Sequence, residues 1–276
     1  IVGESGCGKT TLGRLILRLL DATSGEVYFK GRNLGGLEAR ELRSLRRKMQ
    51  IVFQDPYSSL NPRMRVGTLI GEGLKIHGMA RGRQVEGRVE ELLAMVGLPA
   101  SAVARFPHEF SGGQRQRIGI ARALAVEPEF VVADEPVSAL DVSVRAQVLN
   151  LLMDIQEEYG LTYLVVAHDL AILERTCDRI AVMFLGQIME LTDSRKLFEN
   201  PRHPYTKALL SAIPIPDPRA ERKHEILHGD VPDPAESPVG CKFSGRCPLT
   251  ENRCIHEEPE LRELSAGHYV RCHLVG

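Results

Sequence analysis

Residues 3–11 read Gly3-Glu4-Ser5-Gly6-Cys7-Gly8-Lys9-Thr10-Thr11. A glycine, four residues and then Gly-Lys-Thr is the spacing of a loop whose backbone N–H groups surround nucleotide phosphates. The glycines let the backbone approach the phosphates because no Cβ stands in the way. We expect a helix over residues 10–20 with its positive N-terminus toward the anion, Lys9 at the β- and γ-phosphates, and the Thr10 hydroxyl on Mg²⁺. Taken alone, the stretch could also be a glycine-rich turn with a surface lysine.

Such a loop should follow a buried strand, but only Ile1 and Val2 precede it, and residue 1 is not methionine. We therefore expect further residues upstream of this sequence.

The composition indicates a globular protein without an affinity for polyanions. The 276 residues suffice for one large α/β domain with an appendage, or for two domains. The net charge is −1, tryptophan is absent and aromatic residues make up 5%, so we expect no nucleic acid partner. No stretch is apolar enough to span a bilayer and no signal peptide is visible, which favours a cytosolic location.

Short β-branched runs alternate with helical patterns along the first two thirds of the chain. The predicted strands are 25–30, 49–53, 130–133 and 163–167, with a hairpin over 179–191 that turns at Gly186-Gln187. The predicted helices between them are 84–96, 113–126 and 142–159. Alternation of this kind is typical of an α/β fold with a mostly parallel sheet.

The composition changes near Asn200, where prolines become frequent, and we place a domain boundary near Asp193. Residues 194–276 then form a small extension with one clear helix over 204–212. Its eight prolines up to residue 238 are Pro201, Pro204, Pro214, Pro216, Pro218, Pro232, Pro234 and Pro238.

Polar side chains follow three of the predicted strands. Asp134 and Glu135 end a buried strand, where Asp134 can hold Mg²⁺ and Glu135 can orient and deprotonate a water. His168 ends another strand and is placed to contact the γ-phosphate. Gln54 follows a third strand but by itself indicates nothing. Acidic residues at a strand end can also be ordinary loop residues.

A second anion-binding helix start is predicted at Ser111-Gly112-Gly113-Gln114. We expect this helix to belong to a helical subdomain, about residues 57–126, that is too far from its own phosphate loop to reach it. The chain thus has two predicted phosphate-binding sites, the loop of residues 3–11 and the start of this helix, for one nucleotide. Both sites can contact the same nucleotide if two chains pair head-to-tail and complete each other's site.

These motifs resemble, in order, those of the nucleotide-binding subunit of an ABC transporter. Residues 3–11 match the Walker A loop, Gln54 the Q-loop, Ser111–Gln114 the signature motif, and 130–134 Walker B. The resemblance implies a P-loop NTPase core over residues 1–193, with Glu135 as catalytic base, 138–141 ending in Asp141 as D-loop, and His168 as switch histidine. It also implies Thr10, Gln54 and Asp134 as Mg²⁺ ligands, and an aromatic residue upstream of the loop to stack on adenine.

The remainder resembles the ATPases of oligopeptide/dipeptide importers. The stretches that carry this likeness are 53–62, 203–210 and Ile213-Pro214-Ile215-Pro216-Asp217-Pro218, the last being more like the F-type than the D-type subunit. The resemblance implies that this chain hydrolyses ATP at the cytoplasmic face of the membrane and so powers import of peptides through a separate permease. It also implies a substrate-binding protein that serves the permease. The second ATPase chain could be identical or paralogous.

Four of the six cysteines lie near the C-terminus, at Cys241, Cys247, Cys254 and Cys272. In a cytosolic protein clustered thiols are first read as metal ligands. The spacing lacks a Cys-x-x-Cys pair and so fits an ordinary zinc ribbon poorly. The family resemblance implies a 4Fe-4S cluster, with zinc or free structural thiols as alternatives.

Other functions remain open from the sequence. Importers of nickel or other small solutes share this type of ATPase. A soluble ABC ATPase of DNA repair or translation is a further alternative, although such proteins usually carry coiled-coil insertions or tandem ATPase domains that are not visible here. A non-hydrolysing structural partner is disfavoured because Lys9, Asp134, Glu135 and His168 are all present.

Overall fold

The computed structural model describes residues 1–213 and 238–275. Its internal contacts divide the chain into two units, one of residues 10–166 and the other of residues 1–9 and 167–276. The division falls inside helix α1 (Lys9–Ile16), between Lys9 and Thr10. The boundary near Asp193 stays a prediction, and the prolines from Pro214 to Pro234 lie outside the described residues.

The unit of residues 10–166 contains the predicted parallel sheet. Strand β4 (Phe130–Asp134) pairs on one side with β3 (Met49–Val52) and on the other with β5 (Thr162–Val166), both in parallel. Four of the five residues of β4 are buried, whereas β5 is mostly half-buried. Strand β5 lies at the edge of this three-stranded sheet, which leaves most of its residues half-buried. The register places Ala133 opposite both Val52 and Val165, so the polar residues after β3 and β4 lie at one edge.

Two predicted elements in this unit are shorter than expected. Helix α1 ends at Ile16 rather than Leu20, because Arg18 has a left-handed backbone with φ of 48°. The strand predicted over 25–30 is reduced to β1 (Tyr28–Phe29), which pairs with β2 (Arg32–Asn33). Lys30 and Gly31, with φ of 51° and 74°, form the tight turn between them.

Helices cluster between β3 and β4 in the chain. They are α3 (Pro56–Ser59), α4 (Val66–Ile76), α5 (Arg83–Met95), the 3₁₀ turns η1 (Ala100–Ala104) and η2 (Pro107–Glu109), and α6 (Gly112–Leu124). In α5 the buried residues are Val85, Val89, Leu92 and Leu93, the spacing of one apolar helix face. Helices α4, α5 and α6 pack on one another, as all views show.

Two further helices complete this unit. Helix α2 (Ala39–Arg46) exposes Arg40 and Arg43 at its surface. Helix α7 (Val142–Tyr159) has the predicted bounds and ends at Gly160, which has a left-handed conformation. Leu17 and Leu34 form a buried cluster with Met49 of β3 and Val132 of β4. Each such aliphatic side chain contributes about 1.5–3 kcal/mol through burial.

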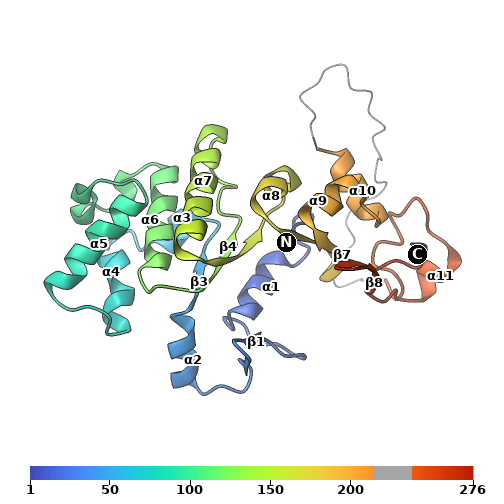
Figure 1. Ribbon diagram of the computed structural model, residues 1–276, viewed down its shortest axis with the longest axis horizontal. Helices are drawn as coiled ribbons and strands as arrows, with labels where there is room; N and C mark the ends of the chain where they lie inside the picture. Colours follow the sequence, from blue (N-terminus) through green and yellow to red (C-terminus); the bar gives the residue numbers. More distant parts are fainter. Residues whose placement is uncertain (214–237, 276) are drawn as a thin grey trace. The chain divides into compact units, whose positions relative to one another are not determined.

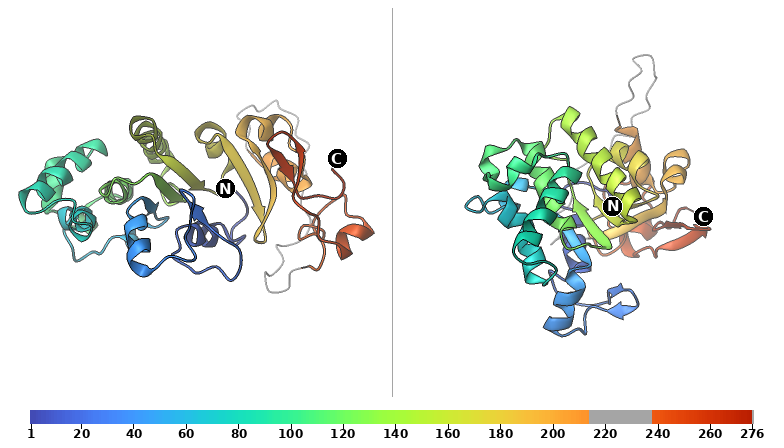
Figure 2. Two further views of the ribbon diagram at one scale, coloured as in Figure 1. Left: turned by 60° about the horizontal axis from the view of Figure 1, so that its bottom comes forward. Right: turned by 60° about the vertical axis from the view of Figure 1, so that its left-hand side comes forward.

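The unit of residues 1–9 and 167–276 contains an antiparallel sheet of order β6-β7-β9-β8. Its strands are β6 (Arg179–Phe184), β7 (Gln187–Asp193), β8 (Arg262–Ser265) and β9 (His268–Val270). The hairpin turn lies at Leu185-Gly186, one residue earlier than predicted, because both have positive φ, 42° and 79°. In Figure 2 the red C-terminal strands lie beside the yellow β7, so the extension completes the sheet of the hairpin.

In the same unit, Val2 forms parallel bridges to Ala167 and Val182. The described residues of this unit also form four short helices. The helices are α8 (Leu170–Thr176), α9 (Ser194–Glu199), α10 (Pro204–Ser211) and α11 (Asn252–His256). Within the described ranges, no helix combines the length and apolar character needed to cross a bilayer.

Candidate nucleotide-binding site

The loop of residues 3–9 is closed on itself by its lysine. The Lys9 side chain is 5% exposed, and its Nζ donates to the carbonyl oxygens of Gly3 at 2.8 Å and Glu4 at 2.9 Å. Gly8 has φ of 99°, and a Cβ on Gly3 would lie 2.1 Å from the Met183 carbonyl oxygen. Glycine is therefore needed at both positions, for conformation at one and for close approach at the other.

The residue after the lysine meets the end of β4. Thr10 Oγ1 donates a hydrogen bond of 2.9 Å to Oδ1 of Asp134, whose side chain is buried. The fold thus brings together two residues that are 124 positions apart. A hydroxyl oxygen and a carboxylate oxygen at this separation are suitable ligands for a hard cation such as Mg²⁺.

Gln54 and Glu135 form a second pair at the same edge of the sheet. Gln54 Nε2 donates to Glu135 Oε2 at 3.0 Å. Glu135 has a left-handed backbone, with φ of 43°, and its N–H donates to the carbonyl of Val166. A non-glycine residue in this conformation is held there by its surroundings, as is common in functional sites.

The turn after Glu135 is fixed by its own side chains. Ser138 Oγ donates to the Glu135 carbonyl at 3.1 Å, and Arg145 Nε donates to the Leu140 carbonyl at 2.7 Å. Asp141 then precedes α7 with an exposed side chain that does not cap the helix. Asp141 therefore lies at the surface beside a rigid turn.

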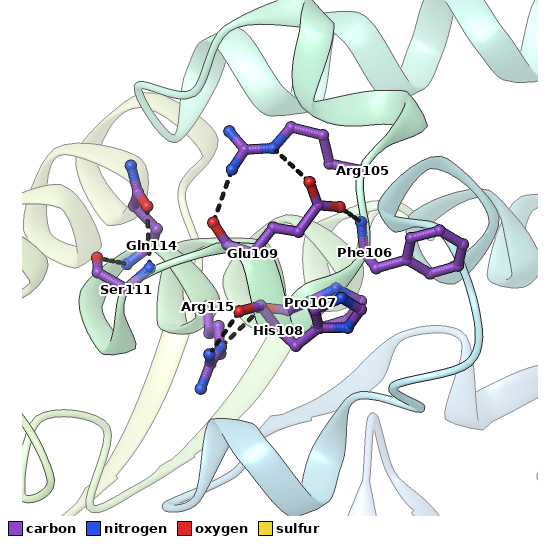
Figure 3. Close-up of polar contacts among 8 residues, drawn as sticks. All are labelled: Arg105, Phe106, Pro107, His108, Glu109, Ser111, Gln114 and Arg115. Atoms are coloured by element: carbon purple, nitrogen blue, oxygen red, sulfur yellow. Dashed lines mark hydrogen bonds and ion pairs between the residues drawn. The ribbon is translucent and has the colours of Figure 1, made fainter.

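Ser111 begins α6 with a capping box. Its Oγ accepts from Gln114 N at 3.3 Å, and Gln114 Oε1 accepts from Ser111 N at 3.0 Å (Figure 3). Both side chains are exposed, whereas Gly113 is buried and a Cβ there would lie 2.3 Å from Val144 Cγ1. The second glycine is thus required by packing against α7.

The turn before Ser111 is tied to α6 by charged groups (Figure 3). Glu109 accepts from the backbone N–H of Phe106, which holds the pKa of its carboxyl below the usual range. Arg115, which is buried, donates to the carbonyls of Pro107 at 2.7 Å and His108 at 3.3 Å. The guanidinium also lies over the Tyr57 ring at 3.8 Å from its centroid. The start of α6 is therefore held in one orientation.

His168 is exposed and follows Ala167, whose N–H donates to the Ile1 carbonyl. Asp169 then caps α8 by accepting from the N–H of Ala171. His168 and Lys9 belong to one unit, whereas the pairs Thr10–Asp134 and Gln54–Glu135 belong to the other. The roles of these residues stay predictions.

The four C-terminal cysteines gather in one region without forming a metal site. The N–H of Cys241 donates to the Cys254 carbonyl, and burial, with smaller contributions from the other three cysteines, raises the pKa of Cys241 to about 11. Burial also raises the pKa of Cys247. Among the described residues, no group of three or more His, Cys, Asp or Glu side chains is arranged to hold a metal ion. The structure thus gives no support to the predicted 4Fe-4S or zinc site.

Sequence reasoning missed two residues that contact the loop. The Tyr205 hydroxyl accepts from the N–H of Glu4 at 3.0 Å, and Arg246 forms an ion pair with the Glu4 carboxylate. These contacts join positions 201 and 242 residues apart. Neither spacing nor periodicity carries a signal for such a distance.

Known proteins share the sequence and the fold of this chain. The family model "ABC transporter" matches residues 1–138, and "Oligopeptide/dipeptide transporter, C-terminal region" matches residues 189–254. A putative peptide import ATP-binding protein of Brucella ovis is 54% identical over 272 residues, 99% of this chain and 86% of its own length. The oligopeptide transport ATP-binding protein AppF of Bacillus subtilis is 52% identical over 277 residues, 99% of this chain and 84% of its own.

Two solved structures share the fold at substantial identity. One is a dimeric post-hydrolysis state of an ATP-binding cassette bound to ADP and Pi, with a TM-score of 0.64, 34% identity, and coverage of 70% of this chain and 84% of that one. The other is cbiO1 of Clostridium perfringens, with a TM-score of 0.65, 28% identity, and coverage of 72% and 78%. This chain therefore belongs to the family of ABC transporter ATP-binding proteins, with a P-loop NTPase core and a C-terminal region of the oligopeptide/dipeptide transporter type.

Proposed function

We propose that this chain is the ATP-hydrolysing subunit that powers import of oligopeptides or dipeptides through a separate membrane permease. The observation that carries the proposal is the Thr10–Asp134 pair, in which the residue after the loop lysine lies 2.9 Å from the carboxylate that ends β4. The peptide class rests on the C-terminal region and on relatives named as peptide import proteins.

Each polar residue of the site has a role in this proposal. The N–H groups of residues 3–11 and Lys9 bind the triphosphate. Thr10, Asp134 and Gln54 would hold Mg²⁺, which would supply positive charge to offset that of the phosphates. Glu135 orients the attacking water and takes its proton. His168 stabilises charge on the transferred phosphoryl group. The bond from Gln54 to Glu135 holds the base in place before the water arrives.

The second half of the site comes from another chain. Ser111 and Gln114 are exposed at the start of a rigid helix whose N-terminus attracts anions, and Asp141 is exposed beside a tied turn. We propose that two copies, identical or paralogous, pair head-to-tail so that Ser111–Gln114 of one chain contacts the nucleotide on the loop of the other. The dimeric cassette among the structural relatives supports the association of two chains.

The base assignment is tested by Glu135→Gln in the assembled transporter. The substitution removes the proton acceptor and keeps the size of the side chain, so ATP binding should persist while turnover falls by about 10²–10⁴-fold, the usual contribution of general base catalysis. Glu157→Gln, an exposed position on α7, is the matched control. Unchanged phosphate release by Glu135→Gln would refute the assignment.

The head-to-tail pairing is tested by combining two substitutions in dimers of defined composition. Lys9→Ala disables the loop of one chain, and Ser111→Arg disables the helix tip that a chain lends. If the tip acts on the partner, placing both substitutions on one chain disables both sites, whereas placing them on different chains leaves one site intact. Hydrolysis that survives only when both substitutions share one chain would show instead that the tip serves its own loop.

The proposal also includes the transported solute, a di- or oligopeptide, and the partners, a permease and a substrate-binding protein. A radiolabelled di- or oligopeptide should enter vesicles that contain this chain, its permease and a substrate-binding protein, and the chain should sediment with membranes that carry the permease, at their cytoplasmic face. Uptake of nickel instead of peptide would assign the chain to the alternative solute class. The relative AppF favours an F-type subunit, although the stretch 214–218 that suggested it lies outside the described residues.

A 4Fe-4S cluster on Cys241, Cys247, Cys254 and Cys272 remains a proposal that rests on the family resemblance and on the donor set. The thiolate charges of Cys247, Cys254 and Cys272 would each oppose ionisation of Cys241, and a bound cation would offset that repulsion. Visible absorption of anaerobically purified protein distinguishes iron–sulfur from zinc, and absence of both metals on elemental analysis would leave the thiols as structural residues.

A further inference from the structure

The C-terminal extension contacts the phosphate loop through the side chain and the backbone of Glu4. Arg246 Nη1 and Nη2 donate to the two carboxylate oxygens of Glu4 at 2.6 and 3.2 Å. The Tyr205 hydroxyl accepts from the Glu4 N–H at 3.0 Å. Arg246 is 9% exposed and Glu4 26%, so this is a two-pronged ion pair largely shielded from water.

The residues that grip Glu4 are themselves anchored in an aromatic cluster. Tyr205 packs against Phe184 and Phe243, with ring centroids 4.9 and 5.3 Å away, and all three rings are fully buried. Phe243 and Arg246 lie in one compact turn, in which the N–H of Arg246 donates to the Phe243 carbonyl. This aromatic cluster, formed by β6 and the extension, therefore fixes both groups that hold Glu4.

The same loop is held at two other points within this unit. The N–H of Gly186, in the β6–β7 turn, donates to the Cys7 carbonyl at 2.9 Å, and Lys9 Nζ donates to the carbonyl of Glu4 itself. Glu4 is thus the residue where the lysine and the extension both hold the loop. Any displacement of Glu4 moves a carbonyl that orients the Lys9 ammonium.

The negative charge of Glu4 affects how well the loop can bind a triphosphate. A carboxylate in a loop that receives a triphosphate repels its ligand, and the repulsion is strong where water is excluded. The guanidinium neutralises this charge and keeps the carboxylate directed at the extension. The contact therefore acts on both the shape and the electrostatics of the loop.

We propose that Arg246, with Tyr205, is a positioning residue for the nucleotide loop, so that the C-terminal extension sets the affinity of the chain for ATP. This inference rests on the proposed role of residues 3–11 as the ATP loop. It assigns the extension a function in nucleotide binding, in addition to any role in assembly with a permease.

The experiment measures ATP affinity with a fluorescent ATP analogue, together with KM and kcat, in the full-length chain assembled with its partners. Arg246→Gln should weaken ATP binding by about three- to tenfold, because the loop loses one charge-assisted pair but keeps its contacts with Lys9 and Gly186. It should raise KM more than it lowers kcat. Arg246→Lys should recover part of the affinity because it keeps the charge but not the two-pronged geometry.

Two controls separate positioning from general destabilisation. Arg253→Gln breaks an exposed ion pair with Glu257 in the same extension and should leave ATP affinity unchanged. In a Glu4→Gln background, Arg246→Gln should cause no further loss, because Arg246 acts through Glu4. A loss of equal size in both backgrounds would overturn the proposal, as would wild-type ATP affinity in Arg246→Gln.

Lys9→Ala distinguishes failure of this inference from failure of the proposed site. If Lys9→Ala abolishes ATP binding while Arg246→Gln leaves it unchanged, the loop is the ATP site and the positioning role is wrong. If Lys9→Ala binds ATP normally, the site assignment itself fails.

Discussion

Replacement of Gly113 by alanine should disrupt the packing at the start of α6. The added Cβ would lie 2.3 Å from Val144 Cγ1, about 1.1 Å closer than the 3.4 Å at which ordinary contact begins. Val144 is β-branched and follows the tied turn at Asp141, so neither its side chain nor its backbone can yield easily. Overpacking of this kind costs about 1–3 kcal/mol of folding free energy.

The measurement is the free energy of unfolding from urea titration of the full chain, with ATP hydrolysis as a second readout. Gly113→Ala should be destabilised, and Val144→Ala introduced with it should restore most of the loss because it removes the clashing methyl group. Gly119→Ala on the same helix is the matched control, since a Cβ there meets nothing within 4 Å, and it should gain up to about 1 kcal/mol from helix propensity. Equal stability of Gly113→Ala and Gly119→Ala, or no rescue by Val144→Ala, would refute the packing argument.

Three further outcomes are expected. Burial lowers the pKa of His203 to about 4, so below pH 6.5 the unfolded chain binds more protons than the folded chain. The contribution of His203 to the free energy of unfolding should be fully present above pH 6.5 and should fall by about 3 kcal/mol on acidification to pH 4. Urea titrations should show a weaker pH dependence in His203→Asn, and an unchanged pH dependence would assign it to other groups. Glu190 is fully buried and accepts from two backbone N–H groups and a histidine ring, so Glu190→Ala should cost about 3 kcal/mol or more by leaving those donors unpaired, and a loss below 1 kcal/mol would contradict this. Arg115→Met removes two hydrogen bonds to backbone carbonyls and the stacking of the guanidinium on the Tyr57 ring. It should lower the free energy of unfolding by about 2 kcal/mol and make the region around Tyr57 more susceptible to protease. A rate of proteolysis equal to that of the wild type would show that Arg115 does not hold that region.

The parts of the site that lie at strand ends could be predicted because parallel strands leave their carboxyl ends at one edge. The apolar run 130–133 followed by Asp134 and Glu135 carries that information locally, and the structure pairs these acids with Thr10 and Gln54. The Gly-Lys-Thr spacing is equally local, since it reflects what one short loop must do.

The remaining features depend on backbone conformation or on distant contacts. The early end of α1 follows from the positive φ of Arg18, a residue type that gives no warning of it. Strands β8 and β9 have few apolar residues and form by pairing with β7, which a sequence pattern does not reveal. The ion pair between Glu4 and Arg246 depends on an aromatic cluster assembled from β6, α10 and the turn at Phe243. For the cysteines, spacing predicts proximity but not whether four sulfur atoms can surround one centre.

The rigidity of the α6 start bears on how two chains could close on a nucleotide. Ser111 uses its hydroxyl oxygen to accept from Gln114, which leaves the O–H able to donate to a phosphate oxygen. Arg115, one helical turn further on, fixes the preceding turn through the Pro107 and His108 carbonyls, so the tip keeps its shape before any ligand arrives. A tip that is already ordered loses little conformational entropy on docking, and more of its contact energy is then available for association. Closure of a dimer on ATP would therefore be governed by the nucleotide and by the positioning of the loop that holds it, rather than by folding of the signature segment.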